Sequence, residues 1–359
     1  MWLVRLGIAL LLSIAFFSAW RSLEKIPVSV VGQPSMTGPI QSKLERPFFE
    51  TLAAETGIPL DVQYRTIDTL GIRDDYQLQL LKGGALDLVS LRFLQNASSE
   101  PTLLGIDLLG LNTDFSTARA VVDAYAPVLD QRLRERFNAK LLGIWPFGPQ
   151  VFFCRSPIKG LSDLAGKRIR VGNANFSPMI TTLGGVPVVI PFDNVAEALS
   201  SGLVDCAITS ATSGNYAGWP EHTAYYFPLG TQMGLNGYVI SLRLWNSFSS
   251  GQQRALEQAF QQHIDNIWSF AKEGHEDASS CNTGGPCIHG KSFHLQLVEP
   301  KPENYSLMGR IAYETTFKDW AQRCDQIYRD CSADWRNRVG PILSKQRPAD
   351  VPAMQGSNP

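Results

Sequence analysis

The chain has 359 residues and a formal net charge of −1, with 32 Lys and Arg residues against 33 Asp and Glu residues. That length is enough for two domains of ordinary size. Charges of both signs are dispersed, without the basic stripe that binds nucleic acid, so we expect no nucleic-acid partner. The apolar fraction of 44% is ordinary for a soluble globular protein.

The N-terminus carries the one segment directed at a membrane. Residues 6–19 are uncharged and mostly apolar, and Arg5 and Arg21 flank them. The segment is shorter than the ~20 residues that span a bilayer, and a basic start with a short apolar core is typical of a secretory signal. We therefore expect residues 1–26 to direct export to the periplasm. Because residues 17–19 lack a small-x-small cleavage pattern, an uncleaved N-terminal anchor stays open.

The cysteine count supports export. Six cysteines are present, and an even number in an exported chain favours disulfides. Cys281 and Cys287 flank a turn-rich loop that makes ring closure easy, so we expect these two to bond.

The other four cysteines leave alternatives open. Cys324 and Cys331 would lie about 10.5 Å apart along one continuous helix, so their pairing requires the helix to end between them. Cys154 and Cys206 both fall in predicted strands. They either pair across neighbouring strands or remain two buried thiols.

The first half of the chain alternates strands and helices. The expected elements are a strand at 28–32, a helix at 43–55, a strand at 60–64, a helix at 76–81 and a strand at 86–91. Gly57 follows the first helix and Gly83 the second, as at many helix ends. This order predicts a parallel sheet with helices on both faces.

The second half repeats the pattern. We expect strands at 150–154, 167–171, 186–190 and 204–208, and helices at 176–183 and 193–201. Asn194 and Glu197 have the spacing of a capping box. Both halves place a Gly-x-x-Asp turn before a buried strand, at 84–87 and 202–205. The repetition suggests two α/β lobes of one design.

A long helix is expected at residues 249–274. Its apolar residues recur every three or four positions and form one stripe: Leu256, Phe260, Ile264, Trp268 and Ala271. At 1.5 Å per residue the helix would be about 39 Å long, enough to lie across two lobes.

Three segments resemble the DctP-like solute-binding proteins of TRAP transporters. They are LKGGALDLVSL at 81–91, PIKGLSDLAGKRIRV at 157–171 and LGGVPVVIPFDNVAEALSSGLVDCAI at 183–208. The resemblance covers roughly residues 28–268 and is most specific over 148–205. It implies a two-lobed α/β periplasmic binding protein of type II-like fold. Each lobe would be a mostly parallel sheet flanked by helices, with the long helix spanning both lobes.

This fold gives expected domain boundaries. Lobe I would comprise residues 27–147 and about 236–275, and lobe II residues 148–235 and about 276–345. Residues 346–359 would form a flexible tail, since the end of the chain is rich in Pro, Gln and Ser.

Two arginines are the main candidates for a ligand site. Ligands of α/β sheets bind beyond the carboxyl ends of strands, where one half carries Arg92 and the other Arg170. A guanidinium fork binds a carboxylate through two parallel hydrogen bonds. The resemblance implies that Arg170 clamps the substrate carboxylate, whereas the residues alone also allow a surface salt bridge. Arg92 is either solvated or a second positive contact suited to a dicarboxylate.

The remaining candidates follow from strand-end position and from the resemblance. They are Gln150, Asn173, Phe176, Thr209, Ser210, Asn215 and Trp219, of which the aromatic side chains could instead pack the lobes. Sialic-acid-binding members of the family carry a second Arg at the position of Gln150 and an acidic residue at that of Arg92. Sialic acid is therefore not the expected ligand.

No cofactor or metal is expected. His275, His289 and His294 lie near Cys281 and Cys287, but their spacing matches no standard zinc pattern. Hydrolase, phosphate-loop and zinc-protease motifs are absent from the sequence, so an α/β enzyme is the less favoured alternative. We expect a solute-binding protein that captures a small organic acid and delivers it to the membrane subunits of a TRAP transporter. The same fold without a transporter, as a ligand sensor or scavenging module, is the other alternative.

Overall fold

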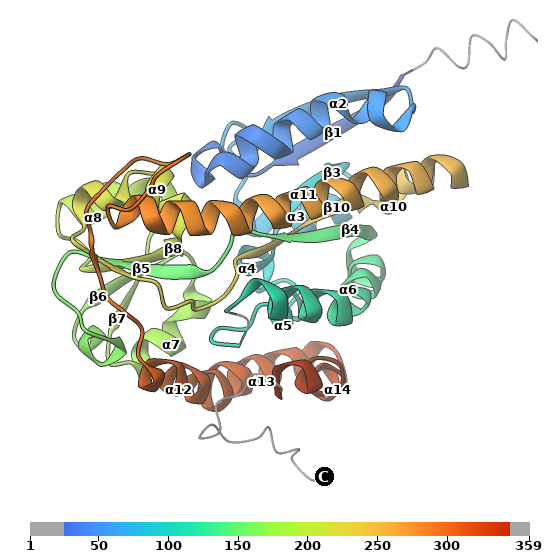
Figure 1. Cartoon of the computed structure of the whole chain (residues 1–359). Helices are drawn as coiled ribbons and strands as arrows, with labels where there is room; N and C mark the ends of the chain where they lie inside the picture. The colour runs from blue at the N-terminus through green and yellow to red at the C-terminus, as the bar shows by residue number, and fades with distance from the viewer. Residues whose placement is uncertain (1–24, 112, 345–359) are drawn as a thin grey trace, which may run out of the picture.

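Two β-sheets, one in each half of the molecule, organise the structure (Figure 1). The computed structural model describes residues 25–111 and 113–344. Almost all of the expected signal segment and the whole expected tail lie outside these residues. Within the described ranges, no helix combines the length and apolar character needed to cross a membrane.

The first sheet has five strands in the order β2-β1-β3-β10-β4. Their bounds are β1 (Ile26–Gly32), β2 (Leu60–Thr66), β3 (Leu88–Arg92), β4 (Ala139–Pro146) and β10 (Leu235–Ser241). β1 pairs in parallel with β2 and β3, whereas β10 runs antiparallel to β3 and β4.

The second sheet has six strands in the order β11-β9-β5-β8-β6-β7. Their bounds are β5 (Gln150–Cys154), β6 (Arg168–Val171), β7 (Val186–Val189), β8 (Cys206–Ser210), β9 (Tyr225–Phe227) and β11 (Gln296–Leu297). β6, β7 and β8 are parallel, and β5 is antiparallel to β8 and β9. Both sheets are thus mixed, because in each a strand that follows an inter-sheet crossover enters in the opposite direction.

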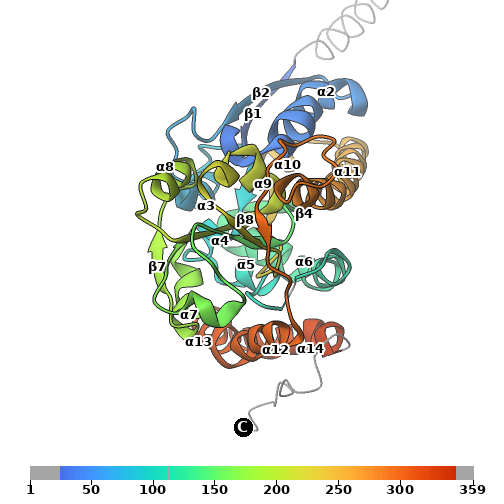
Figure 2. The ribbon, with the colours of Figure 1, turned by 60° about the vertical axis from the view of Figure 1, so that its left-hand side comes forward.

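Helices cover both sheets (Figure 2). Those associated with the first sheet are α2 (Arg46–Thr56), α3 (Gln77–Lys82), α4 (Phe93–Asn96), α5 (Thr102–Gly105), α6 (Phe115–Phe137) and α10 (Leu242–Trp245). Those associated with the second are α7 (Ser177–Thr182), α8 (Val195–Ser200) and α9 (Ala211–Tyr216). Short helical turns include η1 (Ser35–Thr37), η2 (Gln41–Glu45), η3 (Asp74–Tyr76), η4 (Leu161–Leu164), η5 (Ala174–Phe176), η6 (Phe192–Asn194) and η7 (Trp219–His222).

In each sheet, the aspartate of a Gly-x-x-Asp turn accepts a backbone hydrogen bond from the neighbouring strand. The Asp87 carboxylate accepts the backbone N–H of Ser29 in β1 at 3.0 Å. The Asp205 carboxylate accepts the backbone N–H of Arg168 in β6 at 2.8 Å. Each aspartate ties its own turn to the neighbouring strand, which explains why β3 and β8 begin two residues later than predicted.

The capping box predicted at Asn194 is wrong. A 3₁₀ turn, η6, precedes α8, and Asn194 makes no capping hydrogen bond with its side chain.

The long helix α11 (Ser250–Asn282) joins the two halves. Its apolar stripe packs into the core of the first sheet, and Ala278 near its end packs into that of the second. The approach to β4 is close, because a Cβ at Gly143 would lie 2.2 Å from Ile264 Cδ1. The helix continues eight residues beyond the predicted end at residue 274, and its last turn carries Cys281.

All six cysteines are paired. Cys281 and Cys287 bond as expected, and Cys154 faces Cys206 across the antiparallel β5–β8 pair. Cys324 bonds Cys331 because the helix ends between them.

The C-terminal helices depart from the expected boundaries. They are α12 (Pro302–Ile311), the π-helical turn η8 (Ala312–Thr316), α13 (Phe317–Ile327) and α14 (Cys331–Ser344). Met308 and Ile311 of α12 join a core of the second sheet. Trp320 and Trp335, further along, join the core of the first. From the sequence, residues 276–345 were expected to belong with the second sheet. α13 and α14 pack with the first sheet instead, because the chain crosses back at η8.

Candidate functional site

A cavity of about 310 Å³ lies between the two sheets. The first sheet and its loops contribute Thr37, Asp74, Arg92, Leu94 and Asn236 to its lining. The second contributes Gln150, Arg170, Phe176, Phe192, Thr209 and Ser213. The volume is in the range of small-molecule sites in proteins, and its walls come from two separately built halves.

Arg170 is fixed in the wall of this cavity by main-chain oxygens. It lies on β6 and is only 4% exposed. Its Nε donates to the Ile190 carbonyl at 2.9 Å, and its Nη1 donates to the Ile208 carbonyl at 3.2 Å. Because each carbonyl belongs to a segment flanking β6 in the sheet, the guanidinium is oriented before any ligand arrives.

The Arg170 guanidinium has no counter-charge among the described residues: no carboxylate there forms an ion pair with it. It lies 5.5 Å from the ring centroid of Trp219 and 5.8 Å from that of Phe192. Burial, with a smaller contribution from Arg92, lowers the pKa of Arg170 to about 9, so the group stays charged at neutral pH. A buried, oriented and unpaired cation is suited to an anion.

Arg92 faces the same cavity, but it forms an ion pair with a carboxylate of the protein. Its Nη1 lies 2.6 Å from Asp74 Oδ2, and its side chain is 15% exposed. Its position at the end of β3 was predicted. The sequence left Arg92 as either a solvated residue or a ligand contact, and neither alternative included the ion pair that the structure shows. Asp74 sits 18 residues earlier in η3, and no sequence signal pointed to it as the partner.

Gln150 lines the cavity beside one of the crossovers between the sheets. Its Nε2 donates to the Gly148 carbonyl at 2.8 Å. Gly234, in the other crossover, has a φ of 66°, and a Cβ there would lie 2.7 Å from Gln150 Nε2. The left-handed φ of Gly234 is one that glycine adopts without strain, and its missing side chain leaves room for that of Gln150. Gln232 and Asn236 also line the cavity, and sequence reasoning missed both.

A buried carboxylate holds the crossover that carries Gln232. Asp107 accepts the backbone N–H groups of Met233 and Leu235, at 2.8 and 2.9 Å. Burial raises the pKa of Asp107 to about 6 against the opposing effect of these hydrogen bonds. Nothing in the local sequence marks Asp107, because its partners lie 126 and 128 residues away.

Only two of the other predicted residues line the cavity. Phe176 and Thr209 line the cavity. Asn173 and Ser210 do not line the cavity, and the Asn173 side chain caps η5 whereas the Ser210 hydroxyl caps α9. These two shape the loops that border the cavity.

Asn215 and Trp219 do not line the cavity. The Asn215 side chain donates to Asn282 Oδ1 and to the Lys291 carbonyl, and it borders a second cavity beside α11. Trp219 is fully buried, with its ring over the guanidinium of Arg170. In the described part of the chain, no group of three His, Cys, Asp or Glu side chains could hold a metal ion.

The family of this chain follows from comparison with known proteins. The model of the DctP family, described as bacterial extracellular solute-binding protein, family 7, matches residues 35–282. The chain belongs to this family. Its members are periplasmic solute receptors rather than a class of enzymes, which confirms the predicted family and the predicted export from the cytoplasm.

Relatives of the DctP family agree with this assignment. A solute-binding protein of Sulfitobacter sp. (strain NAS-14.1) is 28% identical over 138 residues, or 38% of this chain and 42% of that protein. The C4-dicarboxylate-binding periplasmic protein DctP of Rhodobacter capsulatus is 24% identical over 140 residues, or 38% of this chain and 41% of that protein. The matched stretch is thus less than half the length of either relative.

A solved structure confirms the fold over nearly the whole chain. The extracytoplasmic solute receptor DctP7 of Bordetella pertussis, which binds pyroglutamic acid, has a TM-score of 0.75 to this chain. The two share 17% sequence identity, and the match covers 88% of this chain and 99% of that one. The predicted two-lobed fold of a solute-binding protein is therefore confirmed.

Proposed function

We propose that this protein is a periplasmic receptor that captures a small monocarboxylate and delivers it to a TRAP-type membrane transporter. The observation that carries the proposal is Arg170, a buried guanidinium held by two carbonyls and facing a cavity without a carboxylate partner. The receptor releases its ligand chemically unchanged, so the site needs binding groups and no catalytic ones.

The different pairing of Arg170 and Arg92 favours one carboxylate over two. Arg170 offers one free positive charge, whereas the charge of Arg92 is compensated by Asp74 at 2.6 Å. A second carboxylate near Arg92 would compete with Asp74 and be repelled by it. The pyroglutamate bound by the structural relative is a monocarboxylate, whereas the ligand class of the Rhodobacter relative is a dicarboxylate.

We propose that the ligand binds between two lobes that close over it. Lobe I would be built on the first sheet and lobe II on the second, with crossovers at residues 147–149 and 228–234. Gln150, Phe176 and Thr209 would contact the ligand together with Arg170, since all four line one cavity. Gln232 would add a polar contact from the crossover, and Asn236 one from β10.

A thermal-shift screen tests this function. Purified protein would be heated with small monocarboxylates, dicarboxylates and the neutral amides of the same acids. A ligand that binds only the folded state raises the unfolding temperature, and at 100 times its dissociation constant adds about 2.7 kcal/mol of stability. We expect at least one monocarboxylate to stabilise the protein and its amide to have no effect. An amide as effective as its acid would contradict the proposed role of Arg170.

A further inference from the structure

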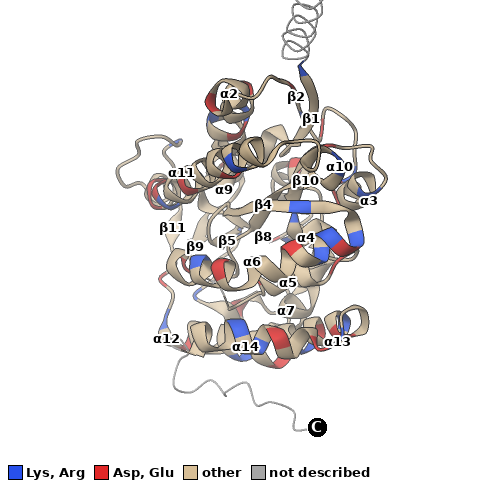
Figure 3. Ribbon diagram, turned by 90° about the vertical axis from the view of Figure 1, so that its right-hand side faces the viewer, with Lys and Arg blue, Asp and Glu red and all other residues tan. Residues whose placement is uncertain are grey.

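The C-terminal helices form a second bridge between the sheets, in addition to α11. α12 is buried against the second sheet through Met308 and Ile311, and α13 and α14 against the first. Figure 3 shows these helices in one row along the side of the molecule away from α2. This bridge, α12–α14, passes from one sheet to the other at η8.

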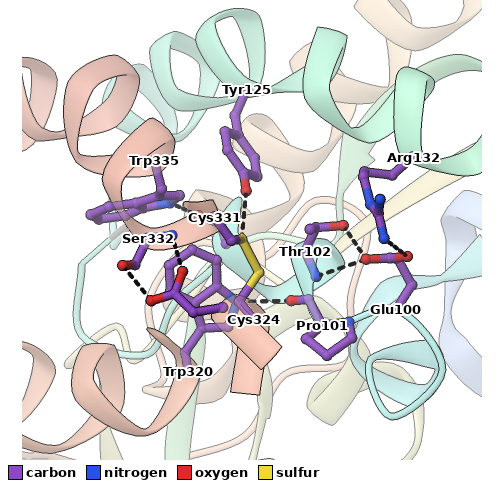
Figure 4. The surroundings of a disulfide bond; sticks show 12 residues. Glu100, Pro101, Thr102, Tyr125, Arg132, Trp320, Cys324, Cys331, Ser332 and Trp335 are labelled. Carbon is purple, nitrogen blue, oxygen red and sulfur yellow. Dashed lines mark hydrogen bonds and ion pairs between the residues drawn. A yellow bond between two sulfur atoms is a disulfide. The ribbon is translucent and has the colours of Figure 1, made fainter. Parts of the chain in front are cut away.

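One end of the bridge is fixed firmly to the first sheet (Figure 4). Trp320 Nε1 donates to the Pro101 carbonyl at 2.8 Å, and Trp335 Nε1 donates to the Gly105 carbonyl. The Cys324–Cys331 disulfide joins α13 to α14 between these two tryptophans. α13 therefore acts as a rigid part of the first half of the molecule.

Arg323 reaches from this rigid helix to the other half. Its Nη1 donates to Asn175 Oδ1 at 2.8 Å. Its Nη2 donates to Asp319 Oδ2 at 2.6 Å, which fixes the guanidinium one turn back along the same helix. Asn175 belongs to η5, directly after β6 of the second sheet.

Asn175 is held by the first half at a second point. Its Nδ2 is 3.5 Å from the carbonyl oxygen of Leu94 in α4. Both hydrogen-bonding ends of this amide thus face groups that belong to the first half of the molecule. Its backbone N–H is bonded to Asn173 Oδ1 at 2.8 Å, so a shift of Asn175 moves the whole turn.

The turn that Arg323 holds is a wall of the ligand cavity. Phe176 follows Asn175 immediately and lines the cavity. A small cavity of about 20 Å³ separates Arg323 from the ligand cavity, and Leu94 and Gln232 line both. Arg323 lies behind the wall and has no place in the lining of the ligand cavity itself.

We propose that Arg323 is a positioning residue for ligand binding. It holds the turn formed by residues 172–176 against the first half of the molecule, and so favours the arrangement in which the lobes enclose the ligand. The consequence for binding rests on the proposed function, whereas the contact with Asn175 does not. Because the Arg323 side chain is 36% exposed, water weakens the contact, and we expect effects of roughly three- to tenfold.

Hydrogen–deuterium exchange of the full chain without added ligand tests the contact. The variants are Arg323→Ala, Asn175→Ala and the two combined. The matched control is Arg338→Ala, which removes an ion pair with Asp334 on α14 and leaves the contact with Asn175 in place. We expect the backbone amides of residues 172–177 to exchange three- to tenfold faster in either single variant than in the wild type. The combined variant should exchange no faster than the single variants. Residues 195–200 of the same half, and the Arg338→Ala protein, should exchange as in the wild type.

A conservative variant separates the contact from a general loosening of the turn. Asn175→Asp keeps an acceptor for Arg323, so its exchange should be slower than that of Asn175→Ala only while Arg323 is present. The proposal would be overturned if Arg323→Ala exchanged as slowly as the wild type, or if the effects of Arg323→Ala and Asn175→Ala multiplied in the combined variant. It would also be overturned if Asn175→Asp slowed exchange relative to Asn175→Ala equally well in a protein that lacks Arg323. All three results are obtained without ligand, so they remain decisive even if the carboxylate proposal fails.

The link to binding has its own measurement. Stopped-flow dissociation would use the acid that stabilises the wild type most in the thermal screen. We expect dissociation to be three- to tenfold faster in Arg323→Ala, with association changed less than twofold. Equal dissociation rates in the two proteins would show that the turn is held without any effect on the ligand, and would overturn the positioning role.

Discussion

Arg92 and Asp74 form an ion pair in the wall of the ligand cavity, with 2.6 Å between Nη1 and Oδ2. Arg170, from the opposite sheet, faces the same cavity without such a partner. The difference between these two arginines is the reason for proposing a ligand with one carboxylate.

The ion pair predicts how to change the ligand preference. Asp74→Asn leaves Arg92 uncompensated, so the affinity for a dicarboxylate such as malonate should rise relative to that for a monocarboxylate by about tenfold. A charge contact at this depth is worth a few kcal/mol before desolvation, and tenfold corresponds to about 1.4 kcal/mol. Calorimetry with the two classes of acid measures the ratio. An unchanged ratio would mean that Asp74 does not set the charge of the site.

Two disulfides should differ in their contribution to stability. Cys154–Cys206 closes a segment of 52 residues and Cys281–Cys287 one of 6. In the chain-entropy account the longer loop is worth about 4 kcal/mol and the shorter about 2 kcal/mol. Replacing both members of each pair by Ala and measuring urea unfolding compares them. If the shorter loop cost as much as the longer one, the entropic account would not apply here.

Buried His263 should make the protein sensitive to acid. It stacks on Phe48 at 3.9 Å between ring centroids and lies 3.1 Å from the Tyr238 hydroxyl. Burial lowers the pKa of His263 to about 3. Below pH 6.5 the unfolded chain takes up a proton that the folded chain excludes, so the stability contribution is complete above pH 6.5 and is lost as pH falls toward 3.

The variant His263→Gln isolates this effect. Between pH 6.5 and pH 4 the wild type should lose on the order of 3 kcal/mol more stability than the variant, at about 1.36 kcal/mol per pH unit. Urea unfolding of both proteins across this range gives the difference. Parallel stability curves would show that His263 is not excluded from protonation in the folded state.

The place of Arg170 beside a cavity between the sheets could be predicted from sequence, but its surroundings could not. The alternating strand and polar loop around Arg170, with the resemblance to a family, were enough to select it. Its two carbonyl partners lie 20 and 38 residues away along the chain, and their approach depends on the order of strands in the sheet. The partner of Arg92 was likewise beyond local reasoning, so the charge of the cavity could not be predicted.

Two of the predicted site residues show the limit of strand-end reasoning. Asn215 and Trp219 follow β8, at the edge of the sheet where ligands bind. α9 begins at Ala211 and carries the chain away from the cavity within one turn, so neither side chain lines it. Sequence position located the edge of the sheet but not the direction of the helix that follows.

The C-terminal helices show a second limit. The apolar residues of α13 and α14 indicate helices with one buried face, but periodicity does not say which sheet that face covers. Trp320 and Trp335 find their hydrogen-bond acceptors more than 200 residues earlier, in the loop around Pro101 and Gly105. Only the folded structure shows that the chain crosses back to the first sheet.

A comparison of Arg170→Ala with Arg168→Ala tests whether the Arg170 guanidinium binds the ligand carboxylate. Arg168 lies on the same strand, but it is exposed and paired with Asp205, so its loss should leave ligand binding unchanged. Loss of Arg170 leaves the ligand carboxylate buried and unpaired, at a cost of about 2–5 kcal/mol, or roughly 30-fold to several thousand-fold in affinity. The measurement is calorimetry of both folded variants with the acid that best stabilises the wild type. We expect binding to be lost in Arg170→Ala and kept in Arg168→Ala, and wild-type affinity in a folded Arg170→Ala protein would contradict the account.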